Sequence, residues 1–278
     1  MVSEVRLVYI LDHNSAMPNS RRPTTIQSVD RAAAILKALA GGPGRLGVSE
    51  LADRLGLARP TVHGLLQTLL AQGFVEQDRD SEKYQLGAGL LQLGYSYLDV
   101  NELRSRSITY AAQLAVRTKF AVRVGVMHGP SAVVVHHVFR PDATLQILEV
   151  GSQLPLHASA LGKALLAFAP AGVIDNLMSA PLERLTKRTS NAAALRLQLN
   201  TIRLQAIATE RDEAVLGESS IAAPIFDRSS NAVGAIAVVG DTDRVFPRGT
   251  ARGLSTAVVE AARGVSRELG APRWPFAG

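Results

Sequence analysis

The chain contains no cysteine, so its candidate chemistry rests on histidine, lysine, serine and carboxylate side chains. Thiolate nucleophiles, disulfides and thiolate metal sites are thereby excluded. His157 and Ser159 lie two residues apart, just before an apolar helical stretch, which suggests a hydrolytic pair. However, no G-x-S-x-G turn surrounds Ser159, and residues two apart at a loop-to-helix junction rarely form a nucleophile with its base. We therefore expect no enzymatic activity.

Gly162 and Lys163 together resemble the end of a phosphate-binding P-loop. That motif requires a glycine at position 157 and a serine or threonine at position 164, where this chain has His157 and Ala164. The pattern therefore does not predict nucleotide binding.

Four histidines, at positions 128, 136, 137 and 157, could suggest a metal site. His136 and His137 are adjacent in a predicted strand, so their side chains point to opposite faces and cannot easily bind one ion. Distant carboxylates such as Glu210, Asp212 or Glu213 would have to complete the site. We expect ordinary packed or hydrogen-bonded histidines, no metal and no cofactor.

Charge and hydropathy indicate the class of partner. The net charge of +6 and isoelectric point near 10.0 suggest a polyanionic partner. Residues 1–100 carry ten basic and ten acidic groups, but residues 17–75 carry seven against three. No apolar run approaches the roughly 18–20 residues of a membrane span, and the apolar stretch at 5–11 lacks a cleavage site. We expect a cytoplasmic protein with no membrane partner, whose residues 1–24 form a disordered arm.

Helix signals near the N-terminus predict a winged helix-turn-helix domain over residues 25–87. A helical pattern over 28–39 ends at a Gly-Gly-Pro-Gly break, and a short helix then runs from Ser49, a suitable N-cap, to Gly56. Pro60 fits the first turn of the next helix, and residues 74–86 resemble a β-hairpin wing. The helix-turn-helix itself should span about residues 48–67.

The second of these helices should read the DNA, because a recognition helix enters the major groove with its N-terminal residues on base edges. Val62, Leu65, Leu66 and Leu69 form its apolar stripe, which turns the remaining side chains outward or to the flanks. Gly64 costs roughly 1 kcal/mol relative to alanine, which suggests close approach to the DNA backbone. The candidate DNA-binding residues are Arg21, Arg22, Ser49, Arg59, Pro60, Thr61, His63, Gly64, Gln67, Thr68, Arg79 and Lys83.

The rest of the chain predicts an α+β protein. Residues 88–101 should form an amphipathic linker helix that also holds a dimer together, with Leu90 and Tyr97 in the contact. Residues 102–270 should form one α+β domain with paired strands and separate helices. The predicted strands are 121–127, 132–139, 219–226 and 232–239, and the predicted helices are 159–169, 192–208 and 249–269.

Several motifs resemble the IclR family of bacterial regulators. VSELADRLGLARPTVHGLLQTLLAQGFVEQD at 48–78 is similar to the family's DNA-binding domain, and PLHASALGKALLAF at 155–168 is similar to an effector-binding motif. GESSIAAPIFD and AVGAIAVVGD at 217–241 match a further motif. HHVFRPD at 136–142 and GYSYLDVNELR at 94–104 resemble the glycerol-operon regulators of actinobacteria. The resemblance covers about residues 25–269.

The resemblance implies a GAF-like α/β domain at the C-terminus that binds a small-molecule effector. It implies contacts from Ser159, Ala160, Leu161, Gly162, Glu210, Ser220, Ala237 and Val239. The N–H groups at the start of the helix near 160 could receive an anion, with Arg123 or Arg140 adding charge. Ala237 and Val239 stand where some carboxylate-binding relatives have serine, so this wall should be less polar.

The resemblance also implies a function. We expect a regulator, a repressor in the first instance, that binds double-stranded operator DNA as a homodimer or a dimer of dimers. Its effector should be a glycerol-pathway metabolite such as glycerol 3-phosphate. The alternative is an activator of an organic-acid or aromatic-acid catabolic operon, controlled by a partly apolar acid. A helix-turn-helix adaptor that binds only proteins is a third possibility, which the polar residues Thr61, Gln67 and Thr68 disfavour.

Overall fold

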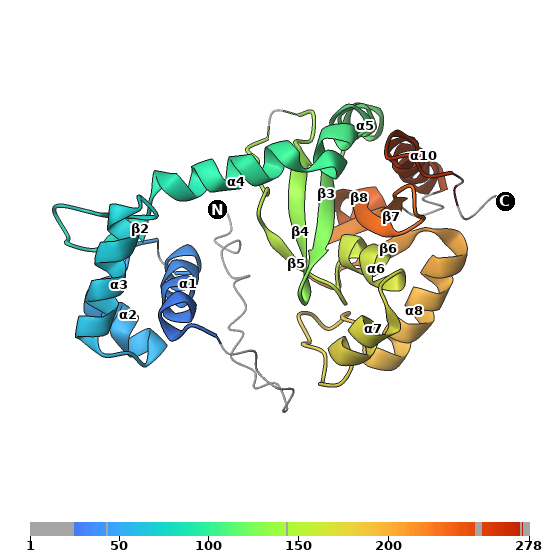
Figure 1. The fold of residues 1–278 in the computed structure, drawn as a ribbon. Helices are drawn as coiled ribbons and strands as arrows, with labels where there is room; N and C mark the ends of the chain where they lie inside the picture. The colour runs from blue at the N-terminus through green and yellow to red at the C-terminus, as the bar shows by residue number, and fades with distance from the viewer. Residues whose placement is uncertain (1–24, 43, 143, 248–251, 273, 275–278) are drawn as a thin grey trace. The chain divides into compact units, whose positions relative to one another are not determined.

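The computed structural model describes residues 25–42, 44–142, 144–247, 252–272 and 274 (Figure 1). The chain divides into two compact units, the first ending at Val100 and the second beginning at Asn101. The expectations for the arm at 1–24, Arg21 and Arg22 included, concern residues outside these ranges. No helix within them is long and apolar enough to cross a membrane.

The first unit has the predicted winged helix-turn-helix order. Its elements are α1 (Gln27–Ala40), α2 (Val48–Leu55), α3 (Arg59–Ala71), β1 (Val75–Gln77), β2 (Tyr84–Leu86) and α4 (Ala88–Val100). Apolar side chains from α1, α2 and α3 share one buried core, which Tyr84 of the wing completes at 2% exposure. β1 and β2 pair antiparallel, with Val75 opposite Leu86, so the hairpin prediction is confirmed.

The start of α2 differs from its prediction. Ser49 is not the N-cap: α2 begins at Val48, and Gly47 precedes it in an extended conformation. The Gly47 N–H donates to Glu50 Oε2 at 2.6 Å, so the glutamate caps this end of the helix. Gly56 adopts φ 64° and ends α2, as predicted, because this left-handed conformation favours glycine. Three residues then separate α2 from α3, which starts with Pro60 in its first turn.

The second unit is built on one antiparallel sheet of six strands in the order β5-β4-β3-β8-β7-β6. These strands are β3 (Ala121–His128), β4 (Ser131–Val138), β5 (Gln153–Pro155), β6 (Ala208–Arg211), β7 (Glu218–Phe226) and β8 (Ala232–Asp241). The helices are α5 (Glu102–Thr118), α6 (Ala160–Ala167), α7 (Ala171–Leu177), α8 (Ala192–Gln205), α9 (Thr242–Val245) and α10 (Arg252–Glu268). The predicted α+β class is thereby confirmed.

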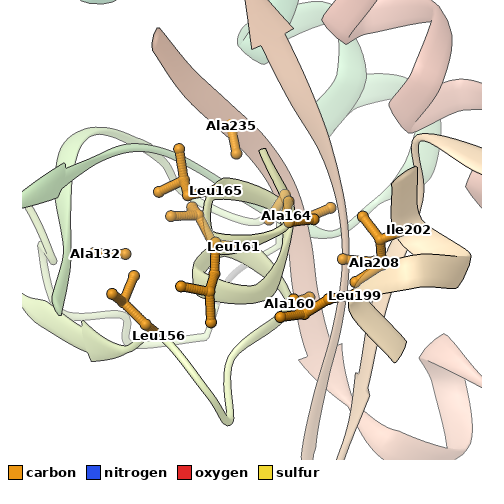
Figure 2. Packing of buried hydrophobic residues seen from close by; sticks show 14 of the residues in the cluster. Ala132, Leu156, Ala160, Leu161, Ala164, Leu165, Leu199, Ile202, Ala208 and Ala235 are labelled. Carbon is orange, nitrogen blue, oxygen red and sulfur yellow. The ribbon is translucent and has the colours of Figure 1, made fainter. Parts of the chain in front are cut away.

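Helices cover both faces of this sheet (Figure 1). On one face, a Cβ added to Gly234 would clash with the side chain of Leu103 of α5. On the other, a Cβ added to Gly125 would lie 2.6 Å from Leu161 of α6. The two glycines therefore let helices approach the strands closely. The core around α6 consists mainly of leucine, isoleucine and alanine side chains from this helix, α7, α8 and the strands (Figure 2).

Some elements of this unit were not predicted. The buried positions of α5 include Ser107 and Ala111, so its apolar periodicity is weak. The helix predicted over 192–208 ends at Gln205, because Ala206 takes the left-handed conformation at φ 54°. Ala208 then opens β6, whose alternating ATER sequence is too short to be distinctive.

Candidate functional site

The exposed face of α3 carries most of the predicted DNA contacts. Arg59 lies in its first turn, and Leu66 at 0% exposure marks the opposite, buried side. The other predicted residues of α3 are exposed, except the half-buried Thr61: Pro60, His63, Gly64, Gln67 and Thr68. A Cβ added to Gly64 would meet no atom within 4 Å, so the fold itself does not require glycine there. The arrangement offers a polar helix face to a groove.

Two ion pairs connect the wing to the rest of the first unit. Lys83 Nζ lies 3.0 Å from Glu50 Oε1, and Arg45 Nη1 lies 2.6 Å from Asp78 Oδ2. Hydrogen bonds from the N–H and hydroxyl of Ser81, with the charge of Arg45, lower the pKa of Asp78. Sequence reasoning missed Arg45, whose role depends on a contact 33 residues away along the chain.

The basic residues predicted to contact DNA differ in whether they are already paired with a carboxylate. Lys83 is engaged by a carboxylate, whereas Arg59 and Arg79 have no ion-pair partner among the described residues. Because an already paired ammonium attracts phosphate less strongly, Arg59 and Arg79 are the stronger candidates for DNA contacts. Ser49 is exposed in the first turn of α2.

One face of the second unit's sheet brings the predicted effector residues together. The register places Glu210 beside Ser220 and Ser220 beside Val239, which forms one row across β6, β7 and β8. Ala237 lies in the next row, beside Arg123 of β3. Side chains of directly paired residues share a face, and Gly125 shows that this face is the one covered by α6.

The start of α6 offers fewer donors than expected. Ser159 is the N-cap, and its Oγ accepts from the Gly162 N–H at 3.0 Å while donating to the Pro155 carbonyl at 2.8 Å. The Gly162 N–H, expected to face the effector, is therefore already used. Ala160 and Leu161 keep N–H groups without a partner among the described residues. Both residues are buried, at 0% and 2% exposure.

These contacts also exclude the hydrolytic pair that His157 and Ser159 suggested. The imidazole of His157 is held by the Glu183 carbonyl, 2.9 Å from Nε2, and not by Ser159. Because the Ser159 hydroxyl is itself occupied as a cap, this pair has no nucleophile–base geometry.

Glu210 and Ser220 contact each other. Glu210 Oε2 accepts from the Ser220 hydroxyl at 2.9 Å, and Oε1 accepts from the Glu213 N–H at 2.7 Å. Burial raises the pKa of Glu210 to about 7, although these hydrogen bonds and the charge of Lys163 act in the opposite direction. Glu210 therefore titrates near neutral pH, and its carboxyl group is directed to the turn that follows β6.

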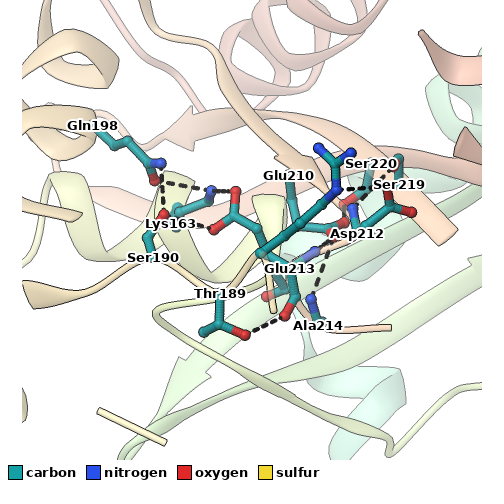
Figure 3. Close-up of polar contacts among 12 residues, drawn as sticks. Lys163, Thr189, Ser190, Gln198, Glu210, Asp212, Glu213, Ala214, Ser219 and Ser220 are labelled. Atoms are coloured by element: carbon teal, nitrogen blue, oxygen red, sulfur yellow. Dashed lines mark hydrogen bonds and ion pairs between the residues drawn. The ribbon is translucent and has the colours of Figure 1, made fainter. Parts of the chain in front are cut away.

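A buried polar cluster lies next to Glu210 (Figure 3). Lys163 is 0% exposed, and its Nζ lies 2.7 Å from Glu213 Oε1 and 3.0 Å from Gln198 Oε1. Ser190 donates to the other oxygen of Glu213 at 3.1 Å. The cluster thus ties α6, α8 and the turn after β6 together. Sequence reasoning gave these residues no such role, although a lysine inside the apolar ALGKALLA helix was a signal.

A second buried ion cluster lies on the same sheet face. Arg123 donates to both carboxylate oxygens of Glu149, with Nη2 2.9 Å from Oε1, and its Nη1 lies 3.1 Å from Glu218 Oε1. Burial alone would lower the pKa of Arg123, but the two carboxylates raise it. Arg140, the other arginine considered for the effector, instead pairs with Asp142 inside its own turn.

Comparison with known proteins agrees with both units. Residues 28–79 match the model of the IclR helix-turn-helix domain, and residues 95–267 match that of the bacterial transcriptional regulator IclR C-terminal domain. A glycerol operon regulatory protein of Streptomyces griseus is 47% identical over 251 residues, covering 90% of this chain and 98% of the relative. The regulator BhcR of Paracoccus denitrificans is 34% identical, covering 89% and 88%.

A solved structure shows the same fold. The crystal structure of a putative IclR regulator from Silicibacter sp. TM1040 has a TM-score of 0.78 and 26% identity, covering 90% of this chain and 100% of that one. Such regulators bind DNA through the helix-turn-helix and small-molecule effectors through the C-terminal domain, and they are not enzymes. The chain therefore belongs to the IclR family of bacterial transcriptional regulators.

Proposed function

We propose that this regulator binds operator DNA through α3 and the wing, and that a small anion bound in the second unit changes its affinity for the operator. The observation that carries the DNA part is the exposed polar face of α3, which begins with Arg59, an arginine that has no ion-pair partner among the described residues. An arginine at this place can reach a phosphate or a guanine edge. The protein then acts in the cytoplasm, where bacterial operators lie.

We propose a dimer as the DNA-binding unit, assembled over α4. Leu91, Leu93 and Tyr95 of this helix are 61%, 55% and 55% exposed, and Tyr97 is 53% exposed. Leu90 is only partly exposed, so it is a weaker contact than the sequence suggested. A second copy would cover these apolar side chains and place two recognition helices on a near-palindromic operator.

For the effector we propose a glycerol-pathway metabolite, with glycerol 3-phosphate as the first compound to test and repression of glycerol-use genes as the outcome. The support is the 47% and 46% identity to glycerol operon regulatory proteins of two Streptomyces species. A partly apolar organic acid is the second candidate, favoured by Ala237 and Val239 on the sheet face beside Ser220. With such an effector, the protein would be an activator of an operon for the catabolism of organic or aromatic acids.

The experiment begins by sequencing DNA fragments that the purified full-length protein retains. A thermal-shift screen of glycerol, glycerol 3-phosphate and a panel of aliphatic and aromatic acids follows. A ligand specific for the folded state at a hundredfold excess over its Kd should stabilise the protein by about 2.7 kcal/mol. Each hit is then tested for operator release. If glycerol 3-phosphate has no effect while an organic acid both stabilises the protein and alters DNA binding, the second candidate replaces the first.

A further inference from the structure

Arg123 of the inner strand β3 lies on the sheet face that carries the predicted effector residues, and carboxylates from two separate segments hold its guanidinium. Glu149 comes from the connection between β4 and β5, and Glu218 begins β7. Exposed fractions of the side chains are 9% for Arg123, 18% for Glu149 and 26% for Glu218. The guanidinium is therefore buried, whereas both carboxylates still reach solvent.

The two carboxylates bind different parts of the guanidinium. Glu149 takes the Nε and Nη2 side with both of its oxygens, and Glu218 takes Nη1 with one. The two-pronged side is the one with which arginine recognises carboxylates and phosphates in ligands. Glu149 thus occupies the position that an anionic ligand would take.

The neighbours of Arg123 put this position beside the residues predicted to bind the effector. Arg123 pairs across the sheet with Ala237 on one side and with His137 on the other. Val239 lies two residues beyond Ala237 on the same face, in the row that contains Ser220 and Glu210. If an effector bound Arg123 through its anionic group, the neutral part of the molecule would therefore lie along the row expected to form the effector site.

We propose that Glu149 is an internal substitute for the anionic group of the effector, and that a phosphate or carboxylate displaces it from Arg123. This proposal rests on the proposed function and names the group that recognises the effector's charge. Glu218 keeps its contact with Nη1 during the exchange, so the guanidinium is never left buried without a partner. Glu149, at 18% exposure, already reaches water from its place on Arg123.

The exchange also gives the ligand a means to act on the protein. The Glu149 N–H lies 3.3 Å from His137 Nδ1, and its carbonyl accepts from the Ser152 N–H at 2.9 Å. Displacement of the side chain breaks the ion pair between this connection and Arg123 of β3, so the connection loses one of its contacts with the sheet. A ligand alters an equilibrium only through a difference in its contacts, and this exchange supplies one.

The test is calorimetric titration of full-length wild type and Glu149→Gln with glycerol 3-phosphate, glycerol, inorganic phosphate and the acid panel. Glutamine keeps the size of the side chain but removes the competing charge. We expect Glu149→Gln to bind the anionic effector at least about tenfold more tightly, which corresponds to 1.4 kcal/mol. Binding of glycerol, which has no charge, should not change. Asp142→Asn, which alters a carboxylate on the same connection outside the sheet face, is the matched control and should behave as wild type.

The outcomes separate the inference from the proposed function. Tighter binding of an organic acid in Glu149→Gln, without binding of glycerol 3-phosphate, supports the exchange and refutes the glycerol assignment. Anion affinity that is unchanged or weaker in Glu149→Gln overturns the exchange, even if ligand-controlled DNA binding holds. Equal glycerol binding by both proteins, with no anion bound by either, overturns it as well. If Glu149→Gln is poorly folded, Glu149→Ala is titrated instead and judged by the same criteria.

Discussion

Replacing Lys163 with methionine removes the ammonium group from the buried cluster next to Glu210 and leaves Glu213 without its ionic partner. The pair is 2.7 Å apart, with side-chain exposures of 0% for Lys163 and 9% for Glu213. Loss of one partner from a buried pair costs about 3–5 kcal/mol, because the remaining charge keeps its desolvation penalty. We expect Lys163→Met to lower the free energy of unfolding of the second unit by that amount. The double variant Lys163→Met/Glu213→Leu should recover most of it, since apolar replacement of both partners is often neutral.

The assay is urea unfolding at neutral pH, followed by far-UV circular dichroism. Arg196→Met is the matched control, because its pair with Asp175 is exposed, at 54% and 65%, and should contribute no more than about 1 kcal/mol. A loss below about 1 kcal/mol in Lys163→Met would refute the reasoning. So would a double variant no more stable than the single one, because it would show that the buried charge is not the source of the loss.

Three further predictions concern the two units. Arg59→Glu should abolish retention of operator DNA by the folded protein, because it sets a negative charge against phosphate or base acceptors. Arg196→Glu makes the same change of charge in the other unit and should still bind the operator. Normal DNA affinity of Arg59→Glu would show that α3 is not the recognition helix. Leu91→Asp/Leu93→Asp should weaken dimerisation in sedimentation experiments, and a wild-type monomer at micromolar concentration contradicts the dimer. Glu210 has its pKa raised from 4.5 to about 7, so its contribution to stability is present below pH 4.5 and is lost as pH rises through 7. The free energy of unfolding of Glu210→Gln should therefore rise by about 3 kcal/mol relative to that of wild type between about pH 4 and pH 8. A difference between the two proteins that stays constant over this range would show that the carboxyl group does not titrate there.

The helix-turn-helix was predictable because its signals are local. Gly56 must adopt φ 64° and Pro60 must stand in a first helical turn, and both requirements can be read within a few residues of sequence. The start of α2 was misplaced because glycine and serine both suit an N-cap, and Glu50 decides between them. Ion pairs of the wing, such as that of Arg45, join segments more than thirty residues apart and have no local signature.

The effector face was only partly predictable. The resemblance named Glu210 and Ser220, which the register of β6 and β7 then placed side by side. It could not show that they bond to each other, or that the cap at Ser159 uses the Gly162 N–H. Residue types alone do not reveal which polar groups a fold has already satisfied, because the partners lie far apart along the chain.

The most direct test of ligand-controlled DNA binding is the Kd of the wild-type protein for its operator, measured by fluorescence anisotropy at fixed salt. The titration is run without ligand and with a compound that calorimetry has shown to saturate the second unit. We expect at least about a tenfold change in Kd, which corresponds to a coupling of about 1.4 kcal/mol or more. An operator Kd that is identical with and without the bound compound would contradict it.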